Sequence, residues 1–113
     1  MAEVISEHIN VFCRLRPAVD EETEGQAESS VTFHDHGTCV YSSGGKRENL
    51  FEFSACFGPQ TAQSEVYENV AKPIVDSTIR GYNSTIIAYG PTGSGKTHTM
   101  RGNNETELGI MPR

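Results

Sequence analysis

Residues 90–97 constrain the fold of this chain more than any other stretch. They fit the phosphate-loop pattern, which is a glycine, four residues of any kind, then glycine, lysine and serine or threonine. The loop reads Gly90, Pro91, Thr92, Gly93, Ser94, Gly95, Lys96, Thr97. A bound phosphate chain needs inward backbone N–H groups and small side chains, which the three glycines allow. We expect Lys96 to reach the β- and γ-phosphates, and the Thr97 hydroxyl to bind the accompanying Mg²⁺.

Both flanks of this loop match the setting that phosphate loops need, a buried strand before and a helix after. Residues 85–89 are a short apolar run rich in β-branched residues, which predicts a strand covered on both faces of a parallel sheet. Residues 96–101 contain no helix breaker and predict the start of a helix whose positive end faces the phosphates. A glycine- and serine-rich surface turn with a stray lysine is the weaker interpretation.

Composition places the 113 residues in one domain with a net charge of −6. No apolar run approaches the ~20 residues that cross a membrane, and the first residues lack a signal-peptide pattern, so we expect a cytosolic chain. The acidic balance argues against a nucleic-acid partner. Cys13, Cys39 and Cys56 are widely spaced without a C-x-x-C pair, which predicts reduced, mostly buried thiols and neither disulfides nor zinc. His34 and His36 lack a third ligand nearby.

The first part of the chain predicts a strand over residues 8–16, where one face of the alternating pattern is more apolar, and Pro17 ends it. Arg14, Arg16 and Pro17 offer flat or firm surfaces on which a purine can stack. Taken alone, two arginines at a strand end are more often solvated charges. The acidic stretch 20–28 predicts a surface loop rather than a metal site.

The middle of the chain predicts a small antiparallel sheet of short strands within residues 31–57, followed by a helix over 61–80. Thr61 is expected to cap this helix, Pro73 to bend it, and Arg80-Gly81 to end it. With the strand over 85–89, the helix forms a crossover unit that brings the phosphate loop to the carboxyl end of a strand.

Five segments, in this order and spacing, resemble the N-terminal third of the kinesin motor domain. The Tyr-Asn, Ala-Tyr-Gly and Gly-Lys-Thr-His-Thr-Met sequences are much more specific than the phosphate loop alone. The family usually has glutamine in place of Pro91 and often glycine in place of Ser84, and Pro91 removes one amide N–H from the loop. The segments are Arg14-Leu15-Arg16-Pro17, Phe57-Gly58-Pro59-Gln60-Thr61, Glu65-Val66-Tyr67, residues 81–100, and Gly109-Ile110-Met111-Pro112-Arg113.

The resemblance implies an α/β fold of the P-loop NTPase, kinesin-motor type, with a mixed central β-sheet and helices on both sides. The chain holds its N-terminal strands, first crossover helix and phosphate loop. The resemblance also implies Mg-ATP binding and ATP hydrolysis coupled to movement along microtubules, in the cytoplasm and its cytoskeleton. By matching positions, Arg14, Arg16 and Pro17 would border the adenine, Tyr82 and His98 would support that end of the nucleotide, and residues 90–97 would hold the phosphates.

Two motifs of this family that sense and hydrolyse ATP, Asn-x-x-Ser-Ser-Arg and Asp-x-x-Gly-x-Glu, do not occur in the 113 residues. We therefore expect no hydrolysis and no motility from these residues alone, and poor stability of the isolated chain. Two interpretations stay open. The chain is either part of a working kinesin or a short non-catalytic protein, derived from a kinesin, that binds nucleotide or interferes with a partner. Another P-loop enzyme, such as a small kinase, does not explain Tyr82-Asn83 or His98-Thr99-Met100.

Overall fold

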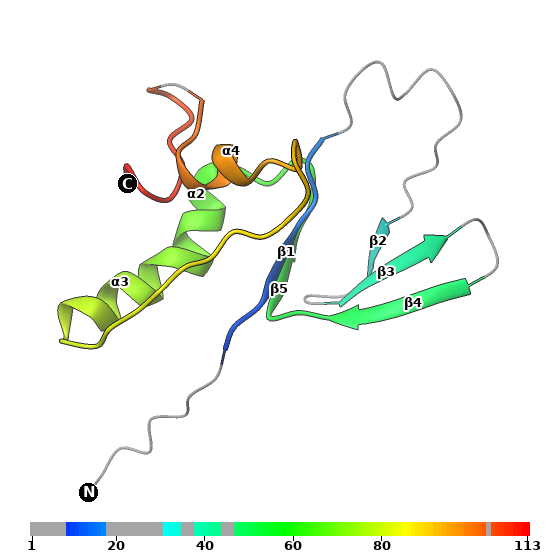
Figure 1. Cartoon of the computed structure of the whole chain (residues 1–113), viewed down its shortest axis with the longest axis horizontal. Coiled ribbons are helices and arrows are strands. Elements are labelled where there is room, and N and C mark those ends of the chain that lie inside the picture. The colour runs from blue at the N-terminus through cyan, green and yellow to red at the C-terminus, as the bar shows by residue number, and fades with distance from the viewer. Residues whose placement is uncertain (1–8, 18–30, 35–37, 44–46, 104) are drawn as a thin grey trace, which may run out of the picture. The chain divides into compact units, whose positions relative to one another are not determined.

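The computed structural model describes residues 9–17, 31–34, 38–43, 47–103 and 105–113 (Figure 1). The chain divides into two compact units, Met1–Phe57 and Gly58–Arg113, called the first and second unit below. The acidic loop predicted over 20–28, residue 8 of the first predicted strand, and His36 lie outside the described residues. Among the described residues, no helix has both the length and the apolar character needed to cross a membrane.

A parallel strand pair lies in the first unit. Strand β1 (Phe12–Arg14) pairs with β5 (Ala55–Phe57), and two backbone hydrogen bonds extend the ladder beyond them, from Leu15 N–H to Phe57 O (2.9 Å) and from Ser54 N–H to Val11 O (2.7 Å). The strand predicted over 8–16 is therefore shorter in the structure. Its ladder is limited by β5, because the chain turns after Phe57, where Thr61 N–H bonds to Gly58 O.

A three-stranded antiparallel sheet completes the first unit, with the strand order β2-β3-β4. Its strands are β2 (Val31–His34), β3 (Thr38–Ser43) and β4 (Arg47–Glu52). The predicted antiparallel sheet is confirmed, although residues 55–57 leave it to pair in parallel with β1. Parallel and antiparallel pairs together with helices make the fold a mixed α/β one, as the sequence predicted.

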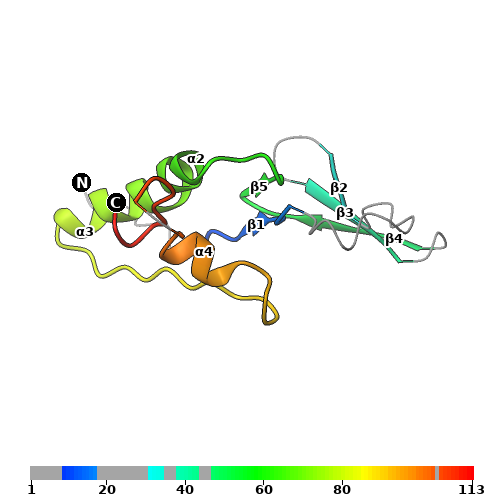
Figure 2. The ribbon, with the colours of Figure 1, turned by 90° about the horizontal axis from the view of Figure 1, so that it is seen from above.

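The predicted helix over 61–80 is present as three continuous pieces: α2 (Gln63–Val66), a π-helical turn η2 (Tyr67–Ala71) and α3 (Lys72–Ile79) (Figures 1 and 2). The expected cap was wrong, because Ala62 occupies the N-cap position and no side chain caps the helix. The π-helical turn ends at Ala71, two residues before Pro73. A proline ring collides with the carbonyl four residues back, and the wider π turn is a known way for a helix to absorb such a conflict.

The end of α3 confirms the predicted stop at Arg80-Gly81. Gly81 has φ 101°, a left-handed conformation that suits glycine. Gly81 N–H bonds to Thr78 O at 3.0 Å, and Tyr82 N–H bonds to Ser77 O at 3.2 Å. These two bonds form a Schellman motif, which satisfies carbonyls that the end of the helix would otherwise leave unpaired.

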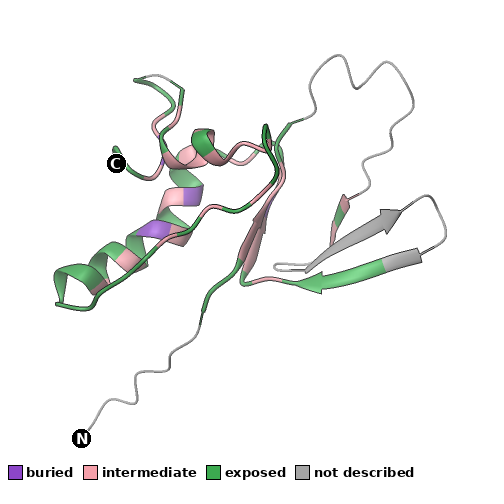
Figure 3. Cartoon of the chain, in the orientation of Figure 1, coloured by how far each residue is buried: buried purple, intermediate pink, exposed green. Residues whose placement is uncertain are grey.

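The strand predicted over 85–89 was wrong: the structure assigns no strand to residues 82–90. A strand needs a neighbour to complete its ladder, and the described residues of the second unit supply no strand. The alternation of a strand is still visible in burial, because Ile86 and Ala88 are half-buried while Ile87 and Tyr89 are 82% and 99% exposed (Figure 3). The predicted burial on both faces is therefore absent.

Candidate functional site

Each glycine within residues 90–97 stands at a position where a larger side chain would be unfavourable. Gly93 and Gly95 have φ 81° and 103°, which side chains disfavour, and Ser94 N–H bonds to Pro91 O at 3.1 Å to close the turn between them. At Gly90 the reason is space, since a Cβ there would meet Ser94 Oγ at 2.6 Å. The segment is thus a tight turn built around positions where side chains do not fit easily.

Helix α4 (Lys96–Met100) begins directly at the end of this turn, with Gly95 as its N-cap and Thr99 N–H bonding to Gly95 O at 3.0 Å. The backbone N–H groups of Gly93, Gly95, Lys96 and Thr97 make no hydrogen bond with any described residue. Unpaired donors at a helix start carry the positive end of the helix dipole. The turn therefore offers several backbone donors to an anion.

The Lys96 side chain is half-buried and folds back over the turn that precedes it. Its Nζ donates a hydrogen bond to Gly90 O, at a distance of 2.5 Å. The ammonium group is therefore held at the same turn as the free N–H groups, where it adds a full positive charge. Thr97 is exposed, and its hydroxyl makes no hydrogen bond within the described part of the chain.

The position of α4 depends on contacts that the sequence pattern does not predict. Gln63 of α2 donates from Nε2 to His98 O at 2.6 Å, which links α2 to α4. After α4 the chain returns along it, with Ile110 N–H bonding to Thr99 O (3.0 Å) and Met111 N–H to Met100 O (2.8 Å). We name residues 101–111 the return segment. Gly102 and Gly109 flank a polar stretch, and this pattern is the signal in the sequence for the return segment.

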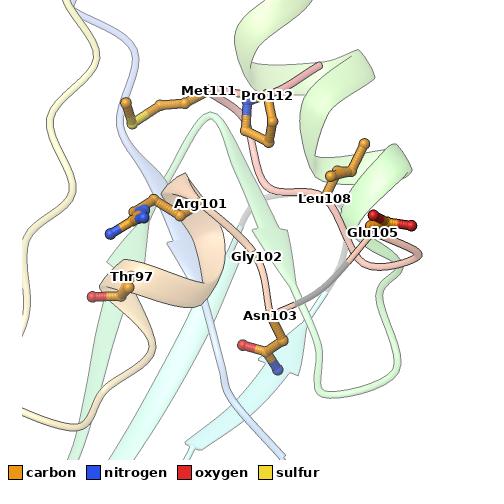
Figure 4. A pocket seen from close by; sticks show the side chains of 8 residues that line it. All are labelled: Thr97, Arg101, Gly102, Asn103, Glu105, Leu108, Met111 and Pro112. Atoms are coloured by element: carbon orange, nitrogen blue, oxygen red, sulfur yellow. The ribbon is translucent and has the colours of Figure 1, made fainter.

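A shallow hollow lies between α4 and the return segment, with Thr97 at its edge (Figure 4). It overlaps the phosphate-loop pattern only at Thr97, so this hollow and the predicted loop do not coincide. We place the site at the loop, because backbone donors form an anion cradle without an enclosed pocket. The residues that line the hollow are Thr97, Arg101, Gly102, Asn103, Glu105, Leu108, Met111 and Pro112.

Tyr82 and His98, which are expected to support the adenine end of the nucleotide, both lie in the second unit. Tyr82 follows the end of α3, is 45% exposed, and precedes the segment that runs from α3 to the turn at Gly90 (Figures 1 and 2). His98 lies in α4, close to the loop in sequence, and is half-buried. No group of three or more metal-binding side chains occurs among the described residues, and a Mg²⁺ held mainly by phosphates would not need one.

Arg14, Arg16 and Pro17 lie in the first unit, at the end of β1. Arg14 is half-buried, and this burial lowers the pKa of its guanidinium from the ordinary value. An arginine remains charged at neutral pH despite such a shift. Arg16 and Pro17 are exposed.

The comparisons with known proteins all point to one family. The family model described as the kinesin motor domain matches residues 14–113. Kinesin-related protein 7 of Dictyostelium discoideum is 42% identical over 109 residues, which cover 96% of this chain and 8% of that protein. The kinesin-1 heavy chain of Homo sapiens is 38% identical over 115 residues, covering 100% of this chain and 11% of that protein. This chain therefore spans a small part of the relatives it matches.

A solved structure of a fast kinesin is similar to the fold described above. It aligns with a TM-score of 0.84 and 36% sequence identity, over 93% of this chain and 30% of the other.

Proposed function

Because the chain belongs to the kinesin motor domain family, we propose that it is the nucleotide-binding part of a microtubule motor ATPase and that residues 90–97 hold the phosphates of Mg-ATP. The observation that carries this proposal is the combination of four unpaired backbone N–H groups with the Lys96 ammonium at one tight turn. Such a cradle suits a multiply charged anion, and the family resemblance selects ATP among such anions.

The residues of the loop fit this ligand in detail. The N–H groups of Gly93, Gly95, Lys96 and Thr97 would donate to phosphate oxygens, and small side chains let these oxygens approach the backbone. Lys96 would exchange its hydrogen bond to Gly90 O for one to the β- or γ-phosphate, which is the stronger partner because it is charged. Thr97 would bind Mg²⁺ through its exposed hydroxyl. When bound, Mg²⁺ would neutralise part of the phosphate charge.

The base of the nucleotide is assigned to the end of β1. Arg14, Arg16 and Pro17 would border the adenine. A guanidinium plane stacks well on an aromatic base, and proline offers a firm apolar surface. Tyr82 and His98 would help to support the adenine end of the nucleotide, as the family resemblance implies.

Microtubule-coupled hydrolysis and a place on the cytoplasmic cytoskeleton are proposed for the motor that contains these residues. For the 113 residues by themselves we propose nucleotide binding without turnover, since hydrolysis also requires groups that position water and sense the γ-phosphate. A microtubule-stimulated ATPase assay of the purified 113-residue chain tests this. Turnover that disappears in Lys96→Ala would contradict the proposal.

The binding proposal is tested by titrating the chain with a fluorescent ATP analogue in the presence of Mg²⁺. Lys96→Ala should weaken binding about 10- to 100-fold, since a hydrogen bond to a charged group contributes about 1.5–3 kcal/mol.

Lys72→Ala is the matched control. Lys72 is an exposed lysine of α3 paired with Glu68 at 2.8 Å, and its alanine variant should bind nucleotide like the parent chain. Equal affinities of the two variants, with unchanged circular dichroism, would rule out the loop as the phosphate site.

A further inference from the structure

Cys13 and Cys56 are register partners in the parallel pair of β1 and β5, although they are far apart in the sequence. The ladder around them is closed on both sides by the hydrogen bonds of Leu15 and Ser54 described above. Neighbouring strands lie about 4.7–4.9 Å apart. Register partners therefore have a Cα separation within the range of about 4.4–6.8 Å that disulfides span.

The two thiols also lie on the same face of this strand pair. The rings of Phe12 and Phe57 are in contact, with centroids 6.1 Å apart and planes at 24°. Phe12 pairs with Ala55, two positions before Phe57, so both rings share one face. Side chains alternate between faces along a strand. Cys13 and Cys56 therefore project side by side from the opposite face.

Neither thiol is fully buried, since both residues have intermediate exposure. We propose that Cys13 and Cys56 form a redox-sensitive dithiol, which a hydroperoxide oxidises to a reversible intramolecular disulfide. The sequence predicted reduced thiols without a disulfide because their spacing suggested no pair. The strand register supplies the proximity that the spacing does not reveal.

The chemistry requires one hydroperoxide for each pair of thiols. One thiolate attacks the peroxide, the O–O bond breaks, and a sulfenic acid and an alcohol or water form. The second thiol then attacks the sulfenic sulfur, which forms the S–S bond and releases water. Two thiols lose two electrons and two protons in total, and the peroxide is reduced by the same two electrons.

The resulting disulfide should be easily reduced. Side chains of register partners in a parallel pair are separated by about the strand spacing of 4.8 Å, whereas disulfides prefer a Cβ separation of about 3.8 Å. The bond is therefore strained, and strained disulfides are the labile ones. While it lasts, it would fix the register of β1 against β5, directly before Arg14.

The test treats the reduced 113-residue chain with one equivalent of hydrogen peroxide, blocks the remaining thiols, and maps disulfide-linked peptides by mass spectrometry. The expected main product links Cys13 to Cys56, has a mass lower by two hydrogens, and is opened by reduced glutathione. Cys39→Ser should keep this product, because Cys39 lies in β3 of the other sheet. Cys13→Ser and Cys56→Ser should both lose it.

The same oxidation of the unsubstituted chain in concentrated urea is a control that does not depend on how the cysteine variants fold. The Cys13–Cys56 product should then lose its dominance over pairings with Cys39, since the strand pair no longer exists. Identical product mixtures with and without urea, or a native product dominated by Cys39 pairings or lacking a disulfide, would overturn the proposal. No nucleotide enters this experiment, so its result is independent of the phosphate loop.

Discussion

At the scale of single residues, the phosphate loop depends on backbone conformation more than on side-chain contacts. Gly95 has φ 103°, and a Cβ added there would have no atom within 4 Å, so its requirement is conformational. Gly90 has an ordinary φ, and the closest obstacle to a side chain there is the Ser94 hydroxyl at 2.6 Å. A hydroxyl can rotate away, whereas a left-handed backbone cannot relax without changing the turn. The two glycines should therefore respond differently to the same substitution.

We predict that Gly95→Ala weakens nucleotide binding about 5- to 30-fold, because a non-glycine residue in the left-handed region costs about 1–2 kcal/mol. Gly90→Ala should have a smaller effect, and adding Ser94→Ala should restore part of it. The measurement is the titration with a fluorescent ATP analogue. Rescue of Gly95→Ala by Ser94→Ala, or a larger effect at Gly90, would show that the loop has another geometry.

The sequence predicted a glycine-built loop at residues 90–97 with a helix starting at its end, because both features follow from a local pattern. It did not predict that Gln63 holds α4 through the His98 carbonyl. A glutamine at a helix start can form many different hydrogen bonds. Only the packing of α2 against α4 determines that Gln63 donates to the His98 carbonyl. The pairing of Cys13 with Cys56 was missed for the same reason, since it follows from strand register.

At the scale of elements, α4 is stabilised by the return segment. Gly102 has φ 82°, and a Cβ there would lie 1.9 Å from Glu107 O and 2.6 Å from Gly109 N. These obstacles are backbone atoms, which cannot rotate away as a side chain can. A substitution at Gly102 therefore forces residues 107–109 of the return segment away from Gly102. This movement would weaken the hydrogen bonds that the adjacent Ile110 and Met111 make to α4.

We predict that Gly102→Ala makes the amides of Ile110 and Met111 exchange with solvent at least about tenfold faster, which corresponds to about 1.4 kcal/mol of lost protection. Gly81→Ala is the matched control, because Gly81 also has a positive φ, 101°, but has no atom within 4 Å of a Cβ. Hydrogen exchange measured by mass spectrometry separates the two. Equal protection of Ile110 and Met111 in both variants would contradict this account of the return segment.

The helix over 61–80 was predicted correctly apart from its cap, since its stop at Arg80-Gly81 is a local signal. The strand over 85–89 was predicted from an equally clear apolar run and was wrong in the structure. A helix makes its hydrogen bonds within itself, whereas a strand exists only with a neighbour. The strand prediction therefore failed because it depends on a neighbouring strand, which the sequence of residues 85–89 does not specify.

At the scale of the whole molecule, few apolar side chains of the described residues are buried. Only Phe57, Val66 and Ala71 are buried apolar residues among them, while Ile79, Ile87 and Tyr89 are 79%, 82% and 99% exposed. Burial of apolar surface is the main favourable term that offsets chain entropy on folding. The 113 residues alone should therefore have a small free energy of unfolding.

We predict that the purified 113-residue chain melts without a sharp transition and binds a hydrophobic dye such as ANS at room temperature, because its apolar surface is exposed. Differential scanning calorimetry and dye fluorescence measure these two properties. Mg-ATP should raise the stability of the loop and α4 by mass action. A cooperative melt of a soluble monomer that does not bind the dye would contradict this prediction.

The proposed function depends on phosphate binding by the backbone of residues 90–97. The most direct measurement is a two-dimensional amide NMR spectrum of the ¹⁵N-labelled chain, recorded while Mg-ATP is added. We predict that the largest shifts occur at the amides of Gly93, Gly95, Lys96 and Thr97, and that Lys96→Ala reduces them at the same ATP concentration. No shift at these four amides, or shifts confined to the hollow beside the return segment, would contradict the account.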